Sequence, residues 1–294
     1  MSNPATESVM LTGRDGNRLA ADAAGDPESP SVLLLHGGGQ TRHSWGTTVQ
    51  VLADKGWRAY SVDLRGHGES EWVSDGDYTL DAFAGDIVAV VAKFAQPPAL
   101  VGASLGGLTS MVAIGEHPDE HVGAALVLVD VAPRIEEAGR DRIGAFMSEH
   151  MEDGFASLDE VAEAIHAYNP HRPRPTDLSG LTKNLRQRDN GRWYWHWDPR
   201  FISGRFGSED ETRSSLIDPA RLRDAARAIT VPTLLVRGRV SDLLSEAGAQ
   251  ELLELVPHAN YIDVAGAGHM VAGDRNDLFN DAVVGFLETV RDSF

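Results

Sequence analysis

The sequence predicts an α/β fold: a mostly parallel, eight-stranded sheet with helices on both faces and a helical cap inserted after the sixth strand. Short apolar runs alternate with stretches of helical periodicity along most of the 294 residues, a pattern typical of parallel sheets covered by helices. Several apolar runs end in turns rich in glycine, histidine or aspartate. After the sixth run, charged amphipathic segments replace apolar strands for about 100 residues, which is too long for a loop and indicates the cap.

The N-terminal half supplies six of the strands. Asp15-Gly16 lies between two alternating runs within residues 9–24, and this pattern predicts an antiparallel hairpin at the sheet edge. Residues 31–35 form a continuous apolar run, as expected of a strand buried on both faces. Further strands are expected at 59–62, in the run before Gly102 and at 124–129, and helices at 45–55, 80–94 and 105–117.

The C-terminal half combines the cap with the end of the sheet. Helical segments are expected in the cap at 134–151, 158–167 and 178–188, and Ser157-x-x-Glu160 is a capping-box pattern for the second of them. Residues 219–229, 246–256 and 277–290 predict helices, and residues 233–236 and 260–264 predict the last two strands. The core domain is therefore expected to comprise residues 1–131 and 219–294, and the cap residues 132–218.

Composition excludes several classes of function. The formal net charge is −18, from 44 acidic and 26 basic residues, which opposes binding to nucleic acid or to an anionic membrane. The chain has no cysteine, so disulfides, thiolate metal ligands and cysteine nucleophiles are excluded. No apolar run approaches the ~18 residues of a membrane span. The first ten residues lack the features of a signal peptide, and a cytoplasmic location is expected.

A candidate nucleophile, Ser104, lies in the pattern Gly-x-Ser-x-Gly between an apolar run and a helical pattern. A serine hydroxyl is a weak nucleophile, so it must be exposed beside a base, and a tight strand-to-helix turn provides that exposure. Small residues at Gly102 and Gly106 would let the turn and the helix approach closely. The first N–H groups of the helix would face a developing oxyanion. On its own the motif is also compatible with a simple glycine-rich loop.

A run of glycines, His36-Gly37-Gly38-Gly39, follows the strand predicted at 31–35. Successive glycines mark a place where the backbone itself approaches a ligand, and one N–H there could bind an oxyanion together with the N–H of Leu105. Gly38 is the first candidate for this donor and Gly39 the second. The alternatives are a flexible turn and a phosphate-binding loop, and the latter is disfavoured because no Gly-Lys-Ser/Thr follows.

A candidate base and two candidate acids follow other strands. His269 ends a loop of small residues after the last predicted strand, so it can reach over the sheet edge. Asp242 follows the strand predicted at 233–236, where catalytic groups gather in open α/β sheets, and it is the first candidate for the acid. Asp130 also ends a strand and is the alternative. His67 lies between two glycines and is interpreted as a structural loop residue.

The order Ser104, Asp242, His269 resembles the nucleophile–acid–base order of the α/β-hydrolase fold. Three flanking segments resemble those of the esterase, cofactor-free haloperoxidase and epoxide-hydrolase branches of this fold. They are His36-Gly37-Gly38-Gly39, Asp63-Leu64-Arg65-Gly66-His67-Gly68-Glu69-Ser70 and Gly266-Ala267-Gly268-His269. The resemblance covers nearly the whole chain except the cap. It implies a Ser-His-Asp triad with oxyanion donors at Gly38 and Leu105, and neither a metal nor an organic cofactor. Epoxide hydrolases and haloalkane dehalogenases of this fold use an aspartate nucleophile, so Ser104 disfavours both activities.

The resemblance implies a serine hydrolase that cleaves a carboxylic ester or lactone of a small, largely apolar substrate through an acyl-enzyme. Carbon–carbon bond hydrolysis, perhydrolysis or a lyase reaction would use similar residues, and some proteins of this fold keep the triad yet act as small-molecule receptors. In the cap, the aromatic run 193–197 either packs the cap or lines the substrate pocket. The candidate substrate-binding residues are Gly39, Met147, Trp195 and Trp197.

Overall fold

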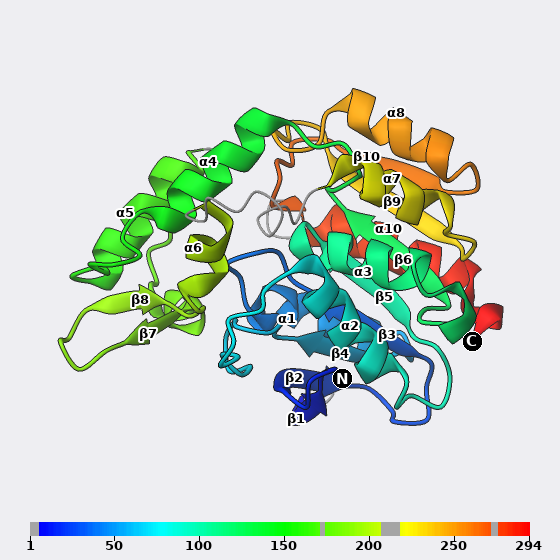
Figure 1. Cartoon of the computed structure of the whole chain (residues 1–294), viewed down its shortest axis with the longest axis horizontal. Coiled ribbons are helices and arrows are strands. Elements are labelled where there is room, and N and C mark those ends of the chain that lie inside the picture. The colour runs from blue at the N-terminus through cyan, green and yellow to red at the C-terminus, as the bar shows by residue number, and fades with distance from the viewer. Residues whose placement is uncertain (1–5, 171–173, 207–217, 272–275) are drawn as a thin grey trace.

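Eight strands form one sheet in the order β1-β2-β4-β3-β5-β6-β9-β10 in the computed structural model, which describes residues 6–170, 174–206, 218–271 and 276–294 (Figure 1). β1 and β2 form an antiparallel hairpin at one edge, β2 pairs antiparallel with β4, and the six strands from β4 to β10 are parallel. The predicted fold class is therefore confirmed. The strands are β1 (Glu7–Thr12), β2 (Arg18–Ala24), β3 (Ser31–Leu35), β4 (Arg58–Val62), β5 (Ala99–Ala103), β6 (Ala125–Val129), β9 (Thr233–Gly238) and β10 (Asn260–Val264).

Helices cover both faces of the sheet because successive residues of each central strand are apolar and point to opposite sides. On β3, Val32 and Leu34 belong to the buried cluster under α1 and α10, whereas Leu33 and Leu35 belong to the cluster under α2, α3, α7 and α8. Each core helix begins and ends within three residues of its predicted bounds. The helices are α1 (Gly46–Asp54), α2 (Leu80–Val91), α3 (Leu105–Gly115), α7 (Pro219–Arg227), α8 (Glu246–Leu255) and α10 (Asn276–Thr289), with short 3-10 helices at Arg42–Trp45, Pro118–Glu120 and Arg291–Ser293.

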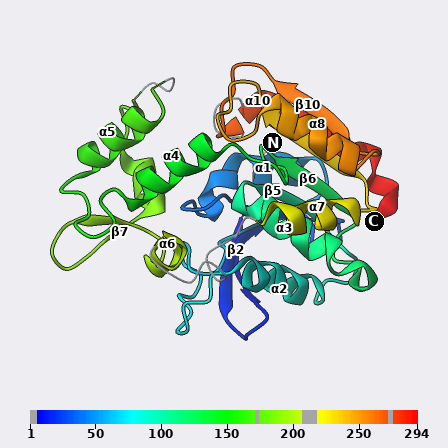
Figure 2. The same ribbon diagram turned by 45° about the horizontal axis from the view of Figure 1, so that its top comes forward.

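The residues between β6 and α7 contribute α4 (Glu137–Ser148), α5 (Leu158–Tyr168), α6 (Arg200–Phe206) and a hairpin of β7 (Leu185–Gln187) and β8 (Trp193–Trp195). Figure 1 and Figure 2 both place α4, α5 and this hairpin to one side of the sheet and its covering helices. Half of the predicted capping box is present at the start of α5. The hydroxyl of Ser157 accepts a hydrogen bond of 3.2 Å from the N–H of Glu160, but the carboxylate of Glu160 accepts the N–H of Ala156 instead of that of Ser157. The boundaries of a separate cap, residues 132–218, stay a prediction.

The helix expected over residues 178–188 is wrong. A 3-10 helix (Ser179–Asn184) is followed at once by β7, which pairs antiparallel with β8. The hairpin turn places Gly191 at φ +75° and is closed by a hydrogen bond of 2.8 Å from the N–H of Gly191 to the carbonyl of Arg188. Asn190-Gly191 is a hairpin signal, but the strands beside it are only three residues long and show little alternation.

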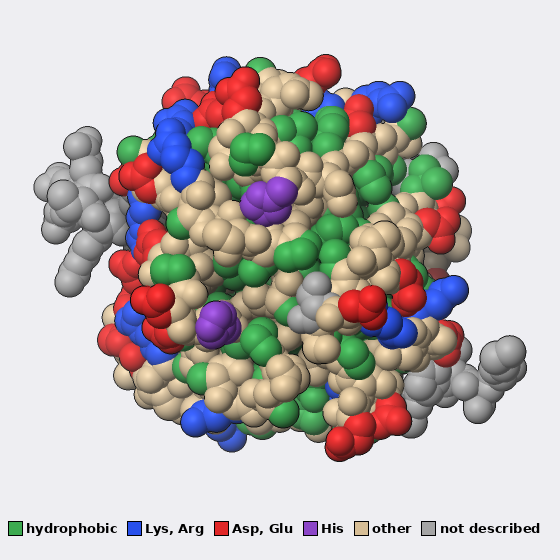
Figure 3. Space-filling view, turned by 90° about the vertical axis from the view of Figure 1, so that its right-hand side faces the viewer, with side chains coloured by type: hydrophobic (Ala, Val, Ile, Leu, Met, Phe, Trp, Pro, Cys, Tyr) green, Lys and Arg blue, Asp and Glu red, His purple; other side chains and the backbone are tan. Residues whose placement is uncertain are grey.

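On one face of the molecule, charge is distributed rather than concentrated. On the face shown in Figure 3, acidic and basic side chains lie mainly around the rim, while uncharged and hydrophobic side chains occupy the centre. The acidic excess behind the net charge of −18 therefore forms no single acidic patch on that face. Within the described part of the chain, no helix is long and apolar enough to cross a bilayer.

A buried ion pair ties the N-terminal hairpin to the helices. The guanidinium of Arg65 donates to both carboxylate oxygens of Asp86 in α2, at 2.7 and 2.6 Å, and neither side chain is more than 1% exposed. Asp86 also accepts hydrogen bonds from the backbone N–H of Arg14 and the amide of Asn17, both in the turn between β1 and β2. Because both charges are removed from water, each depends on the other.

Replacing Arg65 by methionine leaves the carboxylate of Asp86 buried without its ionic partner. We expect Arg65→Met to lower the free energy of unfolding by about 3 kcal/mol. Arg140→Ala is the control, because Arg140 pairs with Asp141 on the surface, where such pairs contribute less than ~1 kcal/mol. Urea unfolding followed by circular dichroism measures both variants. A loss for Arg65→Met as small as that for Arg140→Ala would contradict the role given to this pair.

Candidate active site

Ser104 lies at the turn between β5 and α3, where the sequence places it. Its backbone has φ +48° and ψ −113°, a conformation that is rare for any residue with a side chain, and the residue is half-buried. The turn is held on two sides. The N–H of Ser104 donates to the carbonyl of Val129 at 3.2 Å, and the N–H of Gly106 donates to the carbonyl of His36 at 3.1 Å. The strained turn therefore positions the serine at the carboxyl edge of the sheet.

Close packing explains the two glycines that flank Ser104. A Cβ on Gly106 would lie 2.3 Å from the carbonyl oxygen of Leu35, and a Cβ on Gly102 would lie 2.4 Å from the backbone of Gly106. No side chain fits at such distances, so only glycine lets α3 begin against β3 and β5. This is the close approach that the sequence predicts for both positions.

In the glycine loop, residues 36–40, two glycine N–H groups are bound to side chains. The N–H of Gly37 donates to Oε1 of Gln40 at 3.0 Å. The N–H of Gly39 donates to Nε2 of His67 at 3.1 Å. Both acceptors are side chains, so these two N–H groups are not available to a substrate.

Two other N–H groups, those of Gly38 and Leu105, are available. Neither has a hydrogen-bond acceptor among the residues that the structure describes. The two residues are neighbours, because a Cβ built on Gly38 would lie 4.0 Å from Cβ of Leu105. The candidate oxyanion donors named from the sequence are therefore both unoccupied and close together, and Gly38 is favoured over Gly39.

His36 holds the glycine loop in place. Its Nδ1 lies 2.8 Å from the carbonyl oxygen of Gly37, and its Nε2 accepts a hydrogen bond of 3.0 Å from the N–H of Leu64. Because a carbonyl only accepts, Nδ1 carries the proton and the ring is neutral. Burial lowers the pKa of His36, and the opposing effect of the nearby Asp63 carboxylate does not outweigh it.

The carboxylate that contacts His269 belongs to Asp130. Nδ1 of His269 lies 2.7 Å from Oδ2 of Asp130, whose side chain is fully buried at the end of β6. Asp130 has φ +51°, a bend that aspartate tolerates better than most residues. Its other oxygen accepts the N–H of Gly238 at 2.9 Å. A carboxylate oxygen accepts the Nδ1 proton, so Nε2 of His269 remains for a reacting group.

The structure corrects the assignment of Asp242 as the partner of His269. The carboxylate of Asp242 forms an ion pair with Arg142 of α4 and is 39% exposed. The turn after β9 instead directs Ser241 inward, where its hydroxyl donates to Oδ2 of Asp130 at 2.5 Å. The reason is local: the turn is closed by a hydrogen bond from Ser241 to Gly238, so the residue before Asp242 faces the sheet edge. Sequence reasoning missed Ser241, whose only signal was its place after that strand.

Two side chains from the cap region contact the glycine loop. A Cβ built on Gly39 would lie 2.8 Å from Cε of Met147 in α4, and one on Gly38 would lie 3.3 Å from Cζ of Phe201 in α6. Met147 was a candidate substrate-binding residue, and its place beside the glycine loop is compatible with that role. Phe201 was not foreseen, because nothing in its local sequence distinguishes it from a packing residue.

The two candidate tryptophans differ in burial and in their ring contacts. Trp197 is buried, pairs as an isolated β-bridge with His67, and has its ring 6.3 Å from that of Phe201. Trp195 packs inside the cap, with ring centroids 5.5 Å from Phe146 and 5.2 Å from Phe155. The aromatic run is interpreted from the sequence either as packing of the cap or as lining of the substrate pocket. The ring contacts of Trp195 are packing contacts, and a substrate-binding role for either residue stays a prediction.

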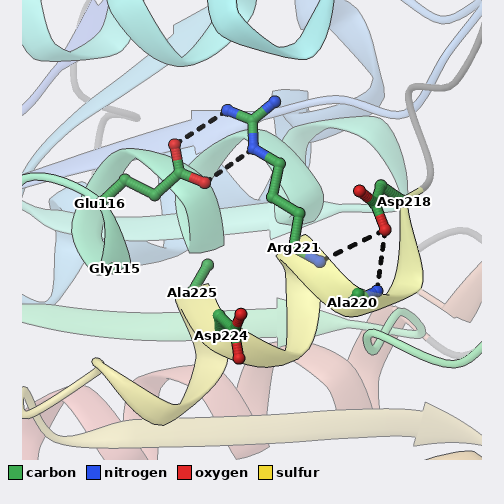
Figure 4. Close-up of a pocket in the computed structure, with 7 residues that line it drawn as sticks. All are labelled: Gly115, Glu116, Asp218, Ala220, Arg221, Asp224 and Ala225. Atoms are coloured by element: carbon green, nitrogen blue, oxygen red, sulfur yellow. Dashed lines mark hydrogen bonds and ion pairs between the residues drawn. The ribbon is translucent and has the colours of Figure 1, made fainter. Parts of the chain in front are cut away.

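A surface hollow lies at the far end of α3 from Ser104 (Figure 4). It is lined by Gly115 and Glu116 and by residues of α7 and its N-terminal cap. In its lining, the guanidinium of Arg221 donates two hydrogen bonds of 2.7 and 2.8 Å to the carboxylate of Glu116, so the two charges are already paired. Eleven helical residues, about 16 Å, separate it from the serine, and it takes no part in the candidate active site. The described residues contain no group of histidine and acidic side chains that could hold a metal ion.

A sequence model described as alpha/beta hydrolase fold matches residues 30–275. The chain belongs to the α/β-hydrolase family. This α/β-hydrolase is 33% identical over 267 residues to the esterase Rv0045c of Mycobacterium tuberculosis, over 89% of the chain and 84% of that relative. To the 3-hydroxybutyrate-oligomer hydrolase of Cupriavidus necator it is 29% identical, over 86% of the chain and 87% of the relative. The expectation of a hydrolase-fold enzyme is confirmed.

Solved structures agree with this assignment. The α/β-hydrolase matches the structure of the Mycobacterium tuberculosis esterase Rv0045c with a TM-score of 0.75 and 29% identity, covering 98% of this chain and 93% of that one. An E-2-(acetamidomethylene)succinate hydrolase matches with a TM-score of 0.83, covering 97% of this chain and all of the other. The identity to that hydrolase is 23%, so this match shows the fold alone.

The neutral state of His36 gives this α/β-hydrolase a pH-dependent contribution to stability. Its pKa is lowered from 6.5 in the folded state, so the contribution is complete above about pH 6.5 and is lost as the pH falls toward the folded-state pKa. We expect His36→Gln to be less stable than the wild type at about pH 8, and the difference in free energy of unfolding to shrink toward about pH 5. Urea unfolding over this range measures the difference, and a constant difference would contradict the prediction.

Proposed function

We propose that this α/β-hydrolase cleaves a carboxylic ester or lactone through an acyl-enzyme, with Ser104 as nucleophile, His269 as base and Asp130 as acid. The observation that carries the proposal is the 2.7 Å hydrogen bond between His269 and the buried Asp130, at the sheet edge where the strained Ser104 turn lies. The free N–H groups of Gly38 and Leu105 support it, because acyl transfer needs donors for an oxyanion.

Each residue has a defined role in the proposed reaction. Oγ of Ser104 attacks the carbonyl carbon while Nε2 of His269 takes the hydroxyl proton. Asp130 keeps Nδ1 protonated and stabilises the imidazolium, and the N–H groups of Gly38 and Leu105 bind the oxyanion. His269 then gives the proton to the leaving alcohol. Water deprotonated by His269 attacks the acyl group, releases the acid and restores Ser104.

The relatives and the side chains beside the glycine loop support the proposed substrate class. The relatives include a protein named as an esterase and one named as a 3-hydroxybutyrate-oligomer hydrolase. Next to the candidate oxyanion donors, the contacts come from Met147 and Phe201, which are apolar. We infer a small, largely apolar acyl group, since such side chains favour apolar ligands.

Steady-state hydrolysis of p-nitrophenyl esters of increasing acyl length, aryl esters and lactones tests the proposal, with Ser104→Ala beside the wild type. Multiple turnovers that disappear in Ser104→Ala support a serine hydrolase, and the preferred chain length gives the size of the acyl pocket. A single acylation without turnover would favour a receptor, and no reaction with any compound would exclude ester hydrolysis and direct attention to carbon–carbon substrates.

The proposal predicts a large loss of activity on substitution of Asp130 and almost none on substitution of Asp242. Asp130→Asn changes the group that fixes the tautomer of His269, and we expect kcat to fall about 10⁴-fold. Asp242→Asn removes a charge from a half-exposed ion pair, and we expect kcat within about twofold of the wild type. Hydrolysis of the best ester measures both, with circular dichroism to verify folding. Equal losses in the two variants, or a larger loss for Asp242→Asn, would refute the role given to Asp130.

A further inference from the structure

His67 uses both of its ring nitrogens although it is fully buried. Its Nδ1 lies 3.0 Å from the carbonyl oxygen of Arg65, and because a carbonyl only accepts, Nδ1 carries the proton. Nε2 is then an acceptor, and it receives the N–H of Gly39 at 3.1 Å. The hydrogen bond to the carbonyl of Arg65 therefore sets the tautomer in which Nε2 can accept the N–H of Gly39.

The ring and the backbone of His67 are both fixed by their neighbours. Its ring centroid lies 4.6 Å from that of Phe201, in edge-to-face geometry, and 5.1 Å from that of His36. The backbone on either side pairs with the cap: Gly68 donates to the carbonyl of His196 at 2.7 Å, and Asp198 donates to the carbonyl of Gly66 at 2.7 Å. His67 thus joins residues 196–198, which follow β8, to the glycine loop.

Both peptide groups next to Gly38 need to be held, because glycine itself restricts neither of its backbone angles. The group before it consists of the carbonyl of Gly37 and the N–H of Gly38, which point in opposite directions across a trans peptide. His36 and the N–H of Gln40 bind that carbonyl, at 2.8 and 3.1 Å. The group after Gly38 is held at the N–H of Gly39 by His67.

We propose that His67 is a positioning residue for the hydrolysis proposed above: by holding Gly39, it keeps the N–H of Gly38 directed at the site where the oxyanion forms. The inference rests on the proposed function of Ser104 and Gly38. Without an acceptor on residue 67, the half-buried N–H of Gly39 turns toward another partner and rotates Gly38 with it. A displacement of about 1 Å in such a donor lowers the rate about 100-fold.

The test compares three substitutions of His67 with a control. His67→Phe keeps an aromatic ring but removes the acceptor, and His67→Asn is too short to reach Gly39. His67→Gln retains a carbonyl oxygen near the position of Nε2. His117→Phe is the control, because His117 also bonds a backbone carbonyl, that of Ala113, but does so near the far end of α3.

We expect kcat on the best ester to fall about 10- to 100-fold in His67→Phe and His67→Asn with KM within about twofold, because an oxyanion contact acts in the transition state. His67→Gln recovers most of the loss, and His117→Phe changes neither constant. Phenylboronic acid, which forms a tetrahedral adduct with a catalytic serine, binds more weakly by the same factor as kcat falls. A purely structural role would lower stability without this selective loss.

Three results would overturn the inference: an unchanged kcat in His67→Phe, a rise in KM alone, or unchanged affinity for phenylboronic acid. Should His67→Phe fail to fold, His67→Asn and His67→Gln decide, and equal activity in these two also overturns it. Labelling of Ser104 by a fluorophosphonate separates this inference from the proposed function. Absence of labelling in the wild type refutes both, whereas normal labelling of the wild type at a rate unchanged in His67→Phe refutes the inference alone.

Discussion

The buried carboxylate of Asp130 is the group on which the arrangement of the site depends. It accepts hydrogen bonds from Gly238 at the end of β9, from Ser241 in the turn after it, and from His269, which follows β10. Three loops that are far apart in the sequence therefore meet at one side chain with no exposed surface. A buried carboxylate destabilises the folded state unless its oxygens accept hydrogen bonds. Because the donors come from different loops, these hydrogen bonds hold the loops together.

Much of the site follows from local sequence. The turn at Ser104 requires glycines two residues to either side, and the distances across it show why no other residue fits. The choice between Asp130 and Asp242 could not be made in that way, because both follow a strand and both precede the base. It depends on the turn after β9, where a hydrogen bond between Ser241 and Gly238 directs the serine inward and leaves Asp242 outside. Such a difference of one residue in a turn carries no signal in composition or periodicity.

The glycine loop and the cap show a similar limit to prediction. Three successive glycines identify a backbone binding site, but which N–H remains free depends on Gln40 and His67, whose side chains reach Gly37 and Gly39. In the cap, helical periodicity correctly predicts α4 and α5 but not β7 and β8, since three-residue strands are too short to show a period. Long amphipathic segments are thus readable from the sequence, whereas short pairings between distant loops are settled only by the assembled fold.

The ion pair between Arg142 and Asp242 attaches α4 to the loop after β9, and its side chains are 45% and 39% exposed. Another contact of the cap with the core, around Asp198, is of a different kind: that carboxylate is 3% exposed and accepts the hydroxyl of Tyr78 at 2.6 Å. Dissolved salt screens exposed charges and affects buried contacts much less. Raised ionic strength therefore weakens the ionic contact between α4 and the loop after β9 more than it weakens the buried contact of Asp198 with Tyr78.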